Sequence, residues 1–313
     1  MSDNWERDVL EKIATEGLKE QRRARRWGIF FKLLGFAYLL IGLLLFMPLI
    51  SDTRHVAGKH GDKHTALVEL NGIIMPEADA SADNVVSGLR AAFEDKKTAG
   101  VILRINSPGG SPVQSGYIYN EILRLRKEYP DIPLYAVITD ICASGGYYVA
   151  SAAEKIYADQ ASIVGSIGVR MDNFGFVDAM KKLGVERRTL TAGENKALLD
   201  PFAPSNPEIN KHLQTLLNDI HGQFINAVKK GRGEKLKEVD GLFSGLIWTG
   251  DQSVEIGLVD ELASASYVAR EVLHAEDIVD FTVQPDFFSQ FSKGVGVTMA
   301  NILIEQGTKP QLR

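Results

Sequence analysis

The chain of 313 residues is long enough for a sizeable hydrophobic core, and 45% of it is hydrophobic and 24% charged. This composition, with 29 Gly and 11 Pro, excludes wholesale disorder, collagen and low-complexity repeats. The single cysteine excludes an intramolecular disulfide and a multi-cysteine zinc or iron–sulfur site. A net charge of −5 argues against a dedicated nucleic-acid-binding protein, so no nucleic-acid partner is expected.

An apolar stretch near the N-terminus departs from this average composition. Residues 27–50 contain one charge, that of Lys32, and about 20 apolar residues are enough for a helix to cross a bilayer. The alternative is a buried core helix, but such a helix normally keeps a polar stripe. Arginines 22, 23, 25 and 26 precede the stretch, so the positive-inside rule places residues 1–26 in the cytoplasm. The long charged lead and the lack of an A-x-A site favour an uncleaved anchor at 27–50 over a signal peptide.

Residues 51–64 are polar and contain glycine, which is typical of a linker. His55, His60 and His64 fall in this segment, but no acidic or cysteine partner has ligand-like spacing. A tether is therefore preferred to a metal site, and we expect no metal and no other cofactor.

From residue 65 to 285, stretches typical of strands alternate with stretches typical of helices. Strands are predicted at 66–75, 99–106, 133–139, 155–159, 162–170 and 185–190, and helices at 84–97, 114–129, 147–153, 174–183 and 208–230. This alternation predicts an α/β domain with a largely parallel sheet. Residues 248–262 are expected to form a turn, a helix and a short strand, and residues 286–313 an amphipathic tail.

Two loops follow predicted strands, at the sheet edge where α/β proteins gather their ligand sites. Residues 140–146 (DICASGG) place Ser144 between a strand and a helix, where backbone N–H groups can stabilise an oxyanion. The same position suits an N-capping serine, and the motif alone leaves both roles open. It is not the G-x-S-x-G elbow, because Cys142 occupies the first glycine position. Residues 106–111 (NSPGGS) can present N–H groups in the same way or form an ordinary turn.

A serine nucleophile needs a base, and no histidine occurs between residues 65 and 211. A Ser-Lys pair is therefore favoured over a Ser-His-Asp triad. A lysine acts as a base only where burial or neighbouring charges lower its pKa. The candidates are Lys155, Lys181, Lys182 and Lys196, of which the last is followed by the apolar residues 197–199. Spacing alone does not select Lys196, and a surface lysine remains the alternative reading.

Several motifs between residues 65 and 263 occur together in the order found in one peptidase family. They are NSPGG (106–110), ASGGYY (143–148), VGSIGV (164–169), K-x-x-x-D-P-F (196–202) and WTGDQ…GLVDEL (248–262). The chain resembles the signal peptide peptidase A family of membrane-anchored serine peptidases, in its short form with one catalytic module. The resemblance implies a ClpP/crotonase-like superhelix of ββα units and a homo-oligomeric ring.

The resemblance also implies roles for individual residues. Ser144 matches the family's nucleophile, Lys196 its general base and Ser166 a serine that helps to orient the lysine, while Gly110 and Gly145 match oxyanion donors. We therefore expect a serine endopeptidase in the bacterial inner membrane, with its catalytic domain in the periplasm. Its expected substrates are remnant signal peptides or other apolar peptides. The alternatives are a non-catalytic scaffold of the same fold and a crotonase-like acyl-CoA enzyme, although CoA is cytoplasmic.

Overall fold

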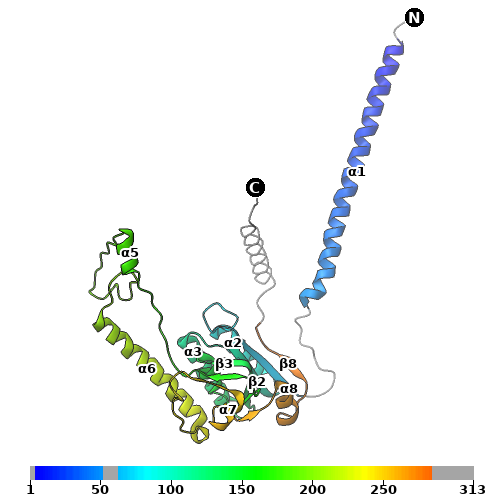
Figure 1. Ribbon diagram of the computed structural model, residues 1–313. Coiled ribbons are helices and arrows are strands. Elements are labelled where there is room, and N and C mark those ends of the chain that lie inside the picture. Colours follow the sequence, from blue (N-terminus) through cyan, green and yellow to red (C-terminus); the bar gives the residue numbers. More distant parts are fainter. Residues whose placement is uncertain (1–3, 52–62, 284–313) are drawn as a thin grey trace, which may run out of the picture. The chain divides into compact units, whose positions relative to one another are not determined.

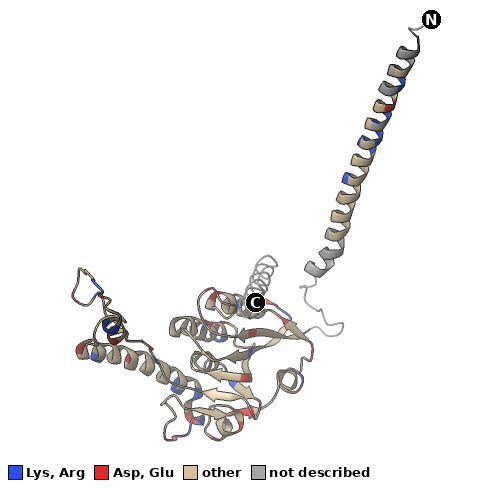
Figure 2. Cartoon of the chain, turned by 45° about the horizontal axis from the view of Figure 1, so that its top comes forward, with Lys and Arg blue, Asp and Glu red and all other residues tan. Residues whose placement is uncertain are grey.

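A computed structural model describes residues 4–51 and 63–283, and the chain divides into two compact units, residues 1–56 and 57–313 (Figure 1). In the first unit, α1 (Asn4–Ser51) is a continuous helix of 48 residues that includes both the charged lead and the apolar stretch. Figure 2 shows the Lys and Arg residues of α1 on the part of the helix that precedes its uncharged stretch. No helix in the described part of the chain combines the length and the hydropathy that a membrane span requires.

Residues 1–3 of the predicted cytoplasmic segment and 284–285 of the predicted α/β domain lie outside the described residues, and so do parts of three further predicted segments. They are the side chains of residues 43–50 at the end of the predicted anchor, most of the predicted linker (52–62), and the predicted tail (286–313).

The second unit is built on a sheet of eight strands within the described residues. The strands are β1 (His64–Asn71), β2 (Thr98–Ser107), β3 (Leu134–Ala143), β4 (Lys155–Ala158), β5 (Ile163–Gly165), β6 (Ile247–Thr249), β7 (Glu261–Leu262) and β8 (Ile278–Asp280). They follow the order β6-β5-β3-β2-β1-β8, and β4 pairs with both β3 and β7. All these pairs are parallel except β5 with β6. The prediction of an α/β domain with a largely parallel sheet is therefore confirmed.

Strand β3 pairs with β2 along one edge and with two different strands, one after the other, along its other edge. Its first part, Tyr135–Ile138, pairs with β4, and its last part, Ile141–Ala143, pairs with β5. The register against β2 shifts between Ile105 and Ser107, next to the same point. The end of β3 is thereby directed toward β5, and the residue that follows β3 is Ser144.

Helices cover both faces of the sheet because strands β2 and β3 are apolar on both sides. Helices α2 (Ala82–Glu94), α3 (Pro112–Glu128) and α4 (Gly145–Ala150) pack over one face, where Leu103 and Ile105 belong to the main core. On the other face, Ile102 and Val137 pack with residues of η2 (Val268–Val272), which follows α8 (Ala265–Tyr267). Burial on both sides explains the continuous apolar runs of the parallel strands.

Residues 169–206, here called the excursion, leave the sheet after β5 and return through the long helix α6 (Pro207–Arg232) (Figure 1). The excursion contains α5 (Val177–Leu183), and no residue between Ile167 and Leu213 is buried. The predicted strand at 185–190 is wrong, because the excursion offers these residues no strand to pair with and a strand needs such a partner. The remaining elements are η1 (Gly233–Lys235) and α7 (Gly250–Glu255).

Candidate active site

A cavity of about 720 Å³ opens where the carboxyl ends of β2, β3 and β5 meet. Its walls contain four of the five residues that the sequence singled out, namely Gly110, Ser144, Gly145 and Ser166. The fifth, Lys196, does not line it. A second cavity of about 660 Å³ lies between the excursion and α6 and shares no lining residue with the first.

Ser144 occupies a sharp turn between β3 and α4. Its backbone adopts φ 53° and ψ −123°, a conformation that side chains other than glycine rarely adopt. Its backbone N–H donates to the carbonyl of Gly165 at 2.8 Å, and its side chain makes no capping hydrogen bond to α4. The N-capping role that the sequence left open is therefore not the role of the Ser144 hydroxyl in this structure.

The glycine loop after β2 is fixed against the turn that follows β1. The N–H of Ile74 donates to the carbonyl of Gly109 at 2.9 Å, and the N–H of Ser111 donates to the carbonyl of Ile74 at 2.7 Å. The Ser107 hydroxyl donates to the carbonyl of Gly72 at 2.6 Å and accepts from the N–H of Gly109 at 3.1 Å. These bonds, none of which involves Ser144, hold the glycine loop in one conformation.

The glycines of the two loops touch one another at Ser144. A Cβ added to Gly109, whose φ is +97°, would lie 2.6 Å from the nitrogen of Gly145 and 2.8 Å from the Cβ of Ser144. A Cβ added to Gly145 would lie 3.2 Å from the nitrogen of Gly110. Neither the N–H of Gly110 nor that of Gly145 has an intramolecular acceptor among the described residues. Two free backbone donors therefore lie close together next to Ser144, and an oxyanion hole needs such a pair of donors.

Another wall of the cavity is formed by Ser166 and Gly168 of the segment 165–168. Ser166 also has a positive φ of 52°, and its N–H donates to the carbonyl of Leu246 at 2.7 Å. The carbonyl of Ile167, the residue after Ser166, accepts a hydrogen bond from the Nε2 atom of His221 on α6 at 3.1 Å. The sequence alone did not predict this contact, because His221 and Ile167 lie 54 positions apart and no local pattern joins the two segments.

Lys196 lies on the exposed excursion, where its backbone N–H donates to the carbonyl of Gly193 at 3.1 Å. Lys181 and Lys182 are exposed in the last turn of α5, and Lys155 is exposed at the start of β4. Within one chain, none of these lysines lines the Ser144 cavity. The structure thus brings the nucleophile and oxyanion candidates together but leaves the base candidate outside.

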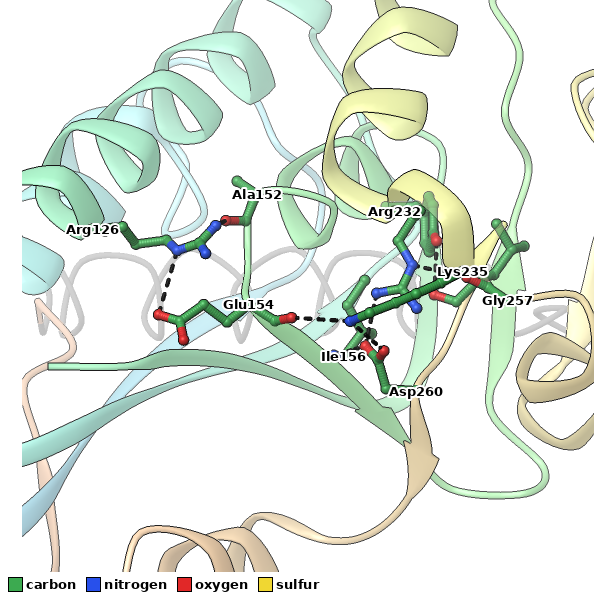
Figure 3. Close-up of polar contacts among 10 residues, drawn as sticks. Arg126, Ala152, Glu154, Ile156, Arg232, Lys235, Gly257 and Asp260 are labelled. Carbon is green, nitrogen blue, oxygen red and sulfur yellow. Dashed lines mark hydrogen bonds and ion pairs between the residues drawn. The ribbon is translucent and has the colours of Figure 1, made fainter. Parts of the chain in front are cut away.

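A buried ion pair joins the end of α6 to the segment before β7. Arg232, at the end of α6, donates to the Asp260 carboxylate at 2.7 Å and to the carbonyl of Gly257 at 2.8 Å, with only 1% of its side chain exposed. Lys235 contacts the other oxygen of Asp260 at 2.7 Å (Figure 3). Next to this cluster, the Tyr147 hydroxyl of α4 donates to the carbonyl of Leu258 at 2.7 Å. The ion pair therefore holds residues 257–260, to which α4, the helix after Ser144, is bonded through Tyr147.

Sequence reasoning missed this ion pair. Asp260 falls within the motif GLVDEL, which could have drawn attention to it. Arg232 lies just beyond the predicted helix at 208–230, and no motif includes it. Burial by itself would raise the pKa of the Asp260 carboxyl, but the hydrogen bonds from Arg232 and Lys235 outweigh it and lower the pKa below its ordinary value.

Comparison with known proteins gives a consistent result. A family model described as "Peptidase family S49" matches residues 126–278. "Putative protease slr0021" of Synechocystis is 34% identical over 202 residues, which cover 64% of this chain and 70% of that protein. "Putative signal peptide peptidase SppA" of Enterococcus faecium is 31% identical over 230 residues, covering 71% of this chain and 66% of that protein.

A further similarity covers only a small part of the matched protein. "Na(+)/H(+) antiporter NhaA" of Brucella abortus (strain 2308) is 45% identical over 210 residues, which are 66% of this chain and 28% of that protein. The chain thus spans less than a third of that relative's length. On the strength of the family model and of the Synechocystis and Enterococcus proteins, the chain belongs to peptidase family S49, whose members are serine peptidases that hydrolyse peptide bonds.

Proposed function

We propose that the chain is an endopeptidase in which Ser144 attacks the scissile carbonyl and the N–H groups of Gly110 and Gly145 bind the oxyanion. One observation carries this proposal: Ser144, whose backbone is strained and whose hydroxyl makes no capping hydrogen bond, lines one cavity together with two residues that have free backbone N–H groups. Backbone strain at a residue other than glycine persists only where the surroundings hold it, and such strain clusters at active sites. The bonds to Gly165 and within the glycine loop supply that support.

We infer that Lys196 of a neighbouring copy is the general base. The excursion exposes apolar side chains, including Phe174, Leu183 and Leu190, and contiguous exposed apolar residues are typical of protein–protein contacts. A head-to-tail contact between identical copies can repeat until a ring closes. Such a contact would also withdraw the lysine from water, which favours the neutral form that a base needs.

The proposed chemistry uses no group beyond these residues and water. The Ser144 hydroxyl gives its proton to the lysine nitrogen as its oxygen bonds to the carbonyl carbon, and the carbonyl oxygen becomes an oxyanion. The lysine then protonates the leaving amine, the peptide bond breaks, and an ester to Ser144 remains. Water then loses a proton to the lysine as its oxygen bonds to the ester carbon, and the lysine returns this proton to the Ser144 oxygen as the ester C–O bond breaks and the acid product leaves. Ser166, which also lines the cavity, is proposed to orient the lysine.

The proposal extends to the fold family, the substrate and the location. The two-way pairing of β3 supports a ClpP/crotonase-like superhelix of ββα units. Ile73, Tyr148, Ile220 and Phe224 line the cavity and suit apolar side chains, which supports apolar peptides such as remnant signal peptides as substrates. The apolar stretch 27–50, after its arginine cluster, supports a single-pass anchor in the inner membrane with the catalytic unit in the periplasm.

Complementation between two inactive chains tests the site. Full-length Ser144→Ala and Lys196→Ala chains, each inactive alone, are co-expressed and assayed with a quenched-fluorescent apolar peptide. In a randomly mixed ring, about a quarter of the contacts join an intact serine to an intact lysine, so about a quarter of the activity should return. An inactive mixture whose chains sediment together would contradict a base supplied by the neighbour.

Single lysine variants provide the matched controls. Lys196→Arg should be inactive, because a guanidinium does not deprotonate in the working pH range. Lys181→Ala and Lys182→Ala, on the same excursion, should keep most of the activity. A Lys196→Arg enzyme that cleaves the peptide at the wild-type rate would rule out Lys196 as the base.

A further inference from the structure

We infer that His221 is a positioning residue of the active site: its Nε2–H holds the Ile167 carbonyl and thereby fixes the wall that carries Ser166. This inference rests on the proposed function, because it assigns a task to a residue that supports Ser144 and Ser166. It gives no proton-transfer role to the histidine.

The first support is the way in which the segment 165–168 is held. The carbonyl of Gly165 accepts from the N–H of Ser144 at 2.8 Å, and the N–H of Ser166 donates to Leu246 at 2.7 Å. The carbonyl of Ile167 accepts from His221 at 3.1 Å. The first two bonds are between backbones, so His221 supplies the side-chain bond among these three attachments of the wall.

The second support is the backbone strain of this wall. Gly165 and Ser166 both have positive φ, 108° and 52°, and a non-glycine residue in that region costs about 1–3 kcal/mol. Such a conformation needs attachments on both sides to persist. The bond to Leu246 holds the N–H of Ser166, before its strained N–Cα rotation, and the bond from His221 holds the carbonyl of the following residue.

The third support is that the bond requires a proton on the Nε2 atom of His221. A carbonyl oxygen only accepts, so Nε2 must carry a proton, whether the ring is the neutral Nε2–H tautomer or the imidazolium. A histidine in this state cannot take a proton from Ser144 through Nε2. The contact therefore commits the Nε2 atom of this histidine, next to the lining residue Ile220, to holding the wall.

The test compares three variants of the full-length protein with the same quenched-fluorescent apolar peptide. His221→Phe keeps an aromatic ring but has no donor, His221→Ala removes the ring, and His221→Gln keeps an N–H near the position of Nε2 but cannot act as a base at neutral pH. His212 on the same helix is exposed, and His212→Phe is the matched control.

We expect His221→Phe and His221→Ala to lose about 10- to 100-fold in kcat, since small displacements of reacting groups have effects of this size. KM should change little, and the thermal midpoint of His221→Gln should stay near that of the wild type. His221→Gln should recover most of kcat, and His212→Phe should match the wild type. If His221→Phe fails to fold, the comparison of His221→Ala with His221→Gln decides.

Two results would overturn the inference. Wild-type kcat in both donor-less variants would show that the bond does not position the site. A folded but inactive His221→Gln would show that the histidine takes part in the chemistry itself. Ser144→Ala is assayed alongside: its activity would contradict the proposed function, whereas an inactive Ser144→Ala beside unaffected His221 variants would contradict only this inference.

Discussion

The backbone N–H of Ser144 donates a 2.8 Å hydrogen bond to the carbonyl of Gly165, and this bond joins the end of β3 to the end of β5. Both partners have positive φ, 53° and 108°. The strained turn at Ser144 is thus held to the end of the neighbouring parallel strand, where glycine adopts its positive φ without steric cost. The wall that carries Ser166 and the turn that carries Ser144 consequently form one unit.

Ser144→Ala and Ser144→Gly separate chemistry from backbone strain. Both variants lack the hydroxyl and should show no peptide cleavage. Ser144→Gly should be the more stable of the two by about 1 kcal/mol, because glycine adopts φ 53° without the steric cost of a Cβ. Chemical denaturation of the two proteins measures this difference. Equal stabilities would show that the turn carries no strain.

Gly109→Ala should disrupt both the site and the fold. The new Cβ would meet the nitrogen of Gly145 at 2.6 Å at a φ of +97°, so we expect a loss of stability on the order of 3 kcal/mol and loss of cleavage. Gly116→Ala in α3 is the control, because nothing lies within 4 Å of its Cβ. Alanine in a helix should stabilise the protein by about 0.5–1 kcal/mol and leave cleavage intact. Thermal unfolding with parallel assays checks both variants.

Asp260→Asn should weaken the protein in a pH-dependent way. Replacing the carboxylate leaves Arg232 buried beside a neutral group, which costs about 3–5 kcal/mol at pH 7. The folded-state pKa of Asp260 is lowered, so its stabilising contribution is present above the unfolded pKa of about 4 and is lost as the pH falls through the folded pKa. The gap between wild type and variant should therefore narrow below about pH 4.

Unfolding free energies measured from pH 7 to pH 3 test this expectation. Asp131→Asn provides the control, since Asp131 is exposed and forms no ion pair among the described residues. It should stay within about 0.5 kcal/mol of the wild type throughout. A gap for Asp260→Asn that is constant over this range would contradict the lowered pKa.

Protease added to spheroplasts tests the proposed topology. The catalytic unit should be digested while a cytoplasmic marker protein stays intact, because the arginine cluster at 22–26 is expected to hold the N-terminus in the cytoplasm. Digestion should remove an epitope placed after Asp280 and spare one placed before Arg22. Complete protection of the catalytic unit until detergent is added would contradict the topology.

The sequence by itself determined the features that depend on neighbours along the chain. Apolar runs located β2 and β3, and helical spacing predicted the helix at 114–129, which the structure has as α3 (Pro112–Glu128). The two glycine-containing loops at strand ends were identified because turn chemistry is local. The candidate residue types followed from the same local patterns, and the motif order indicated the family.

Only the tertiary structure decided what depends on segments far apart in the sequence. It showed that the Ser144 side chain makes no cap, that the backbones of Gly109 and Gly145 touch, and that residues 185–190 pair with no strand in the described chain. It also joined Arg232 to Asp260 and His221 to Ile167. Hydropathy and propensity act over a few residues, whereas the packing of β3 between β2 and β5 sets the direction of the chain at Ser144. That direction is fixed by contacts between strands that no local pattern records.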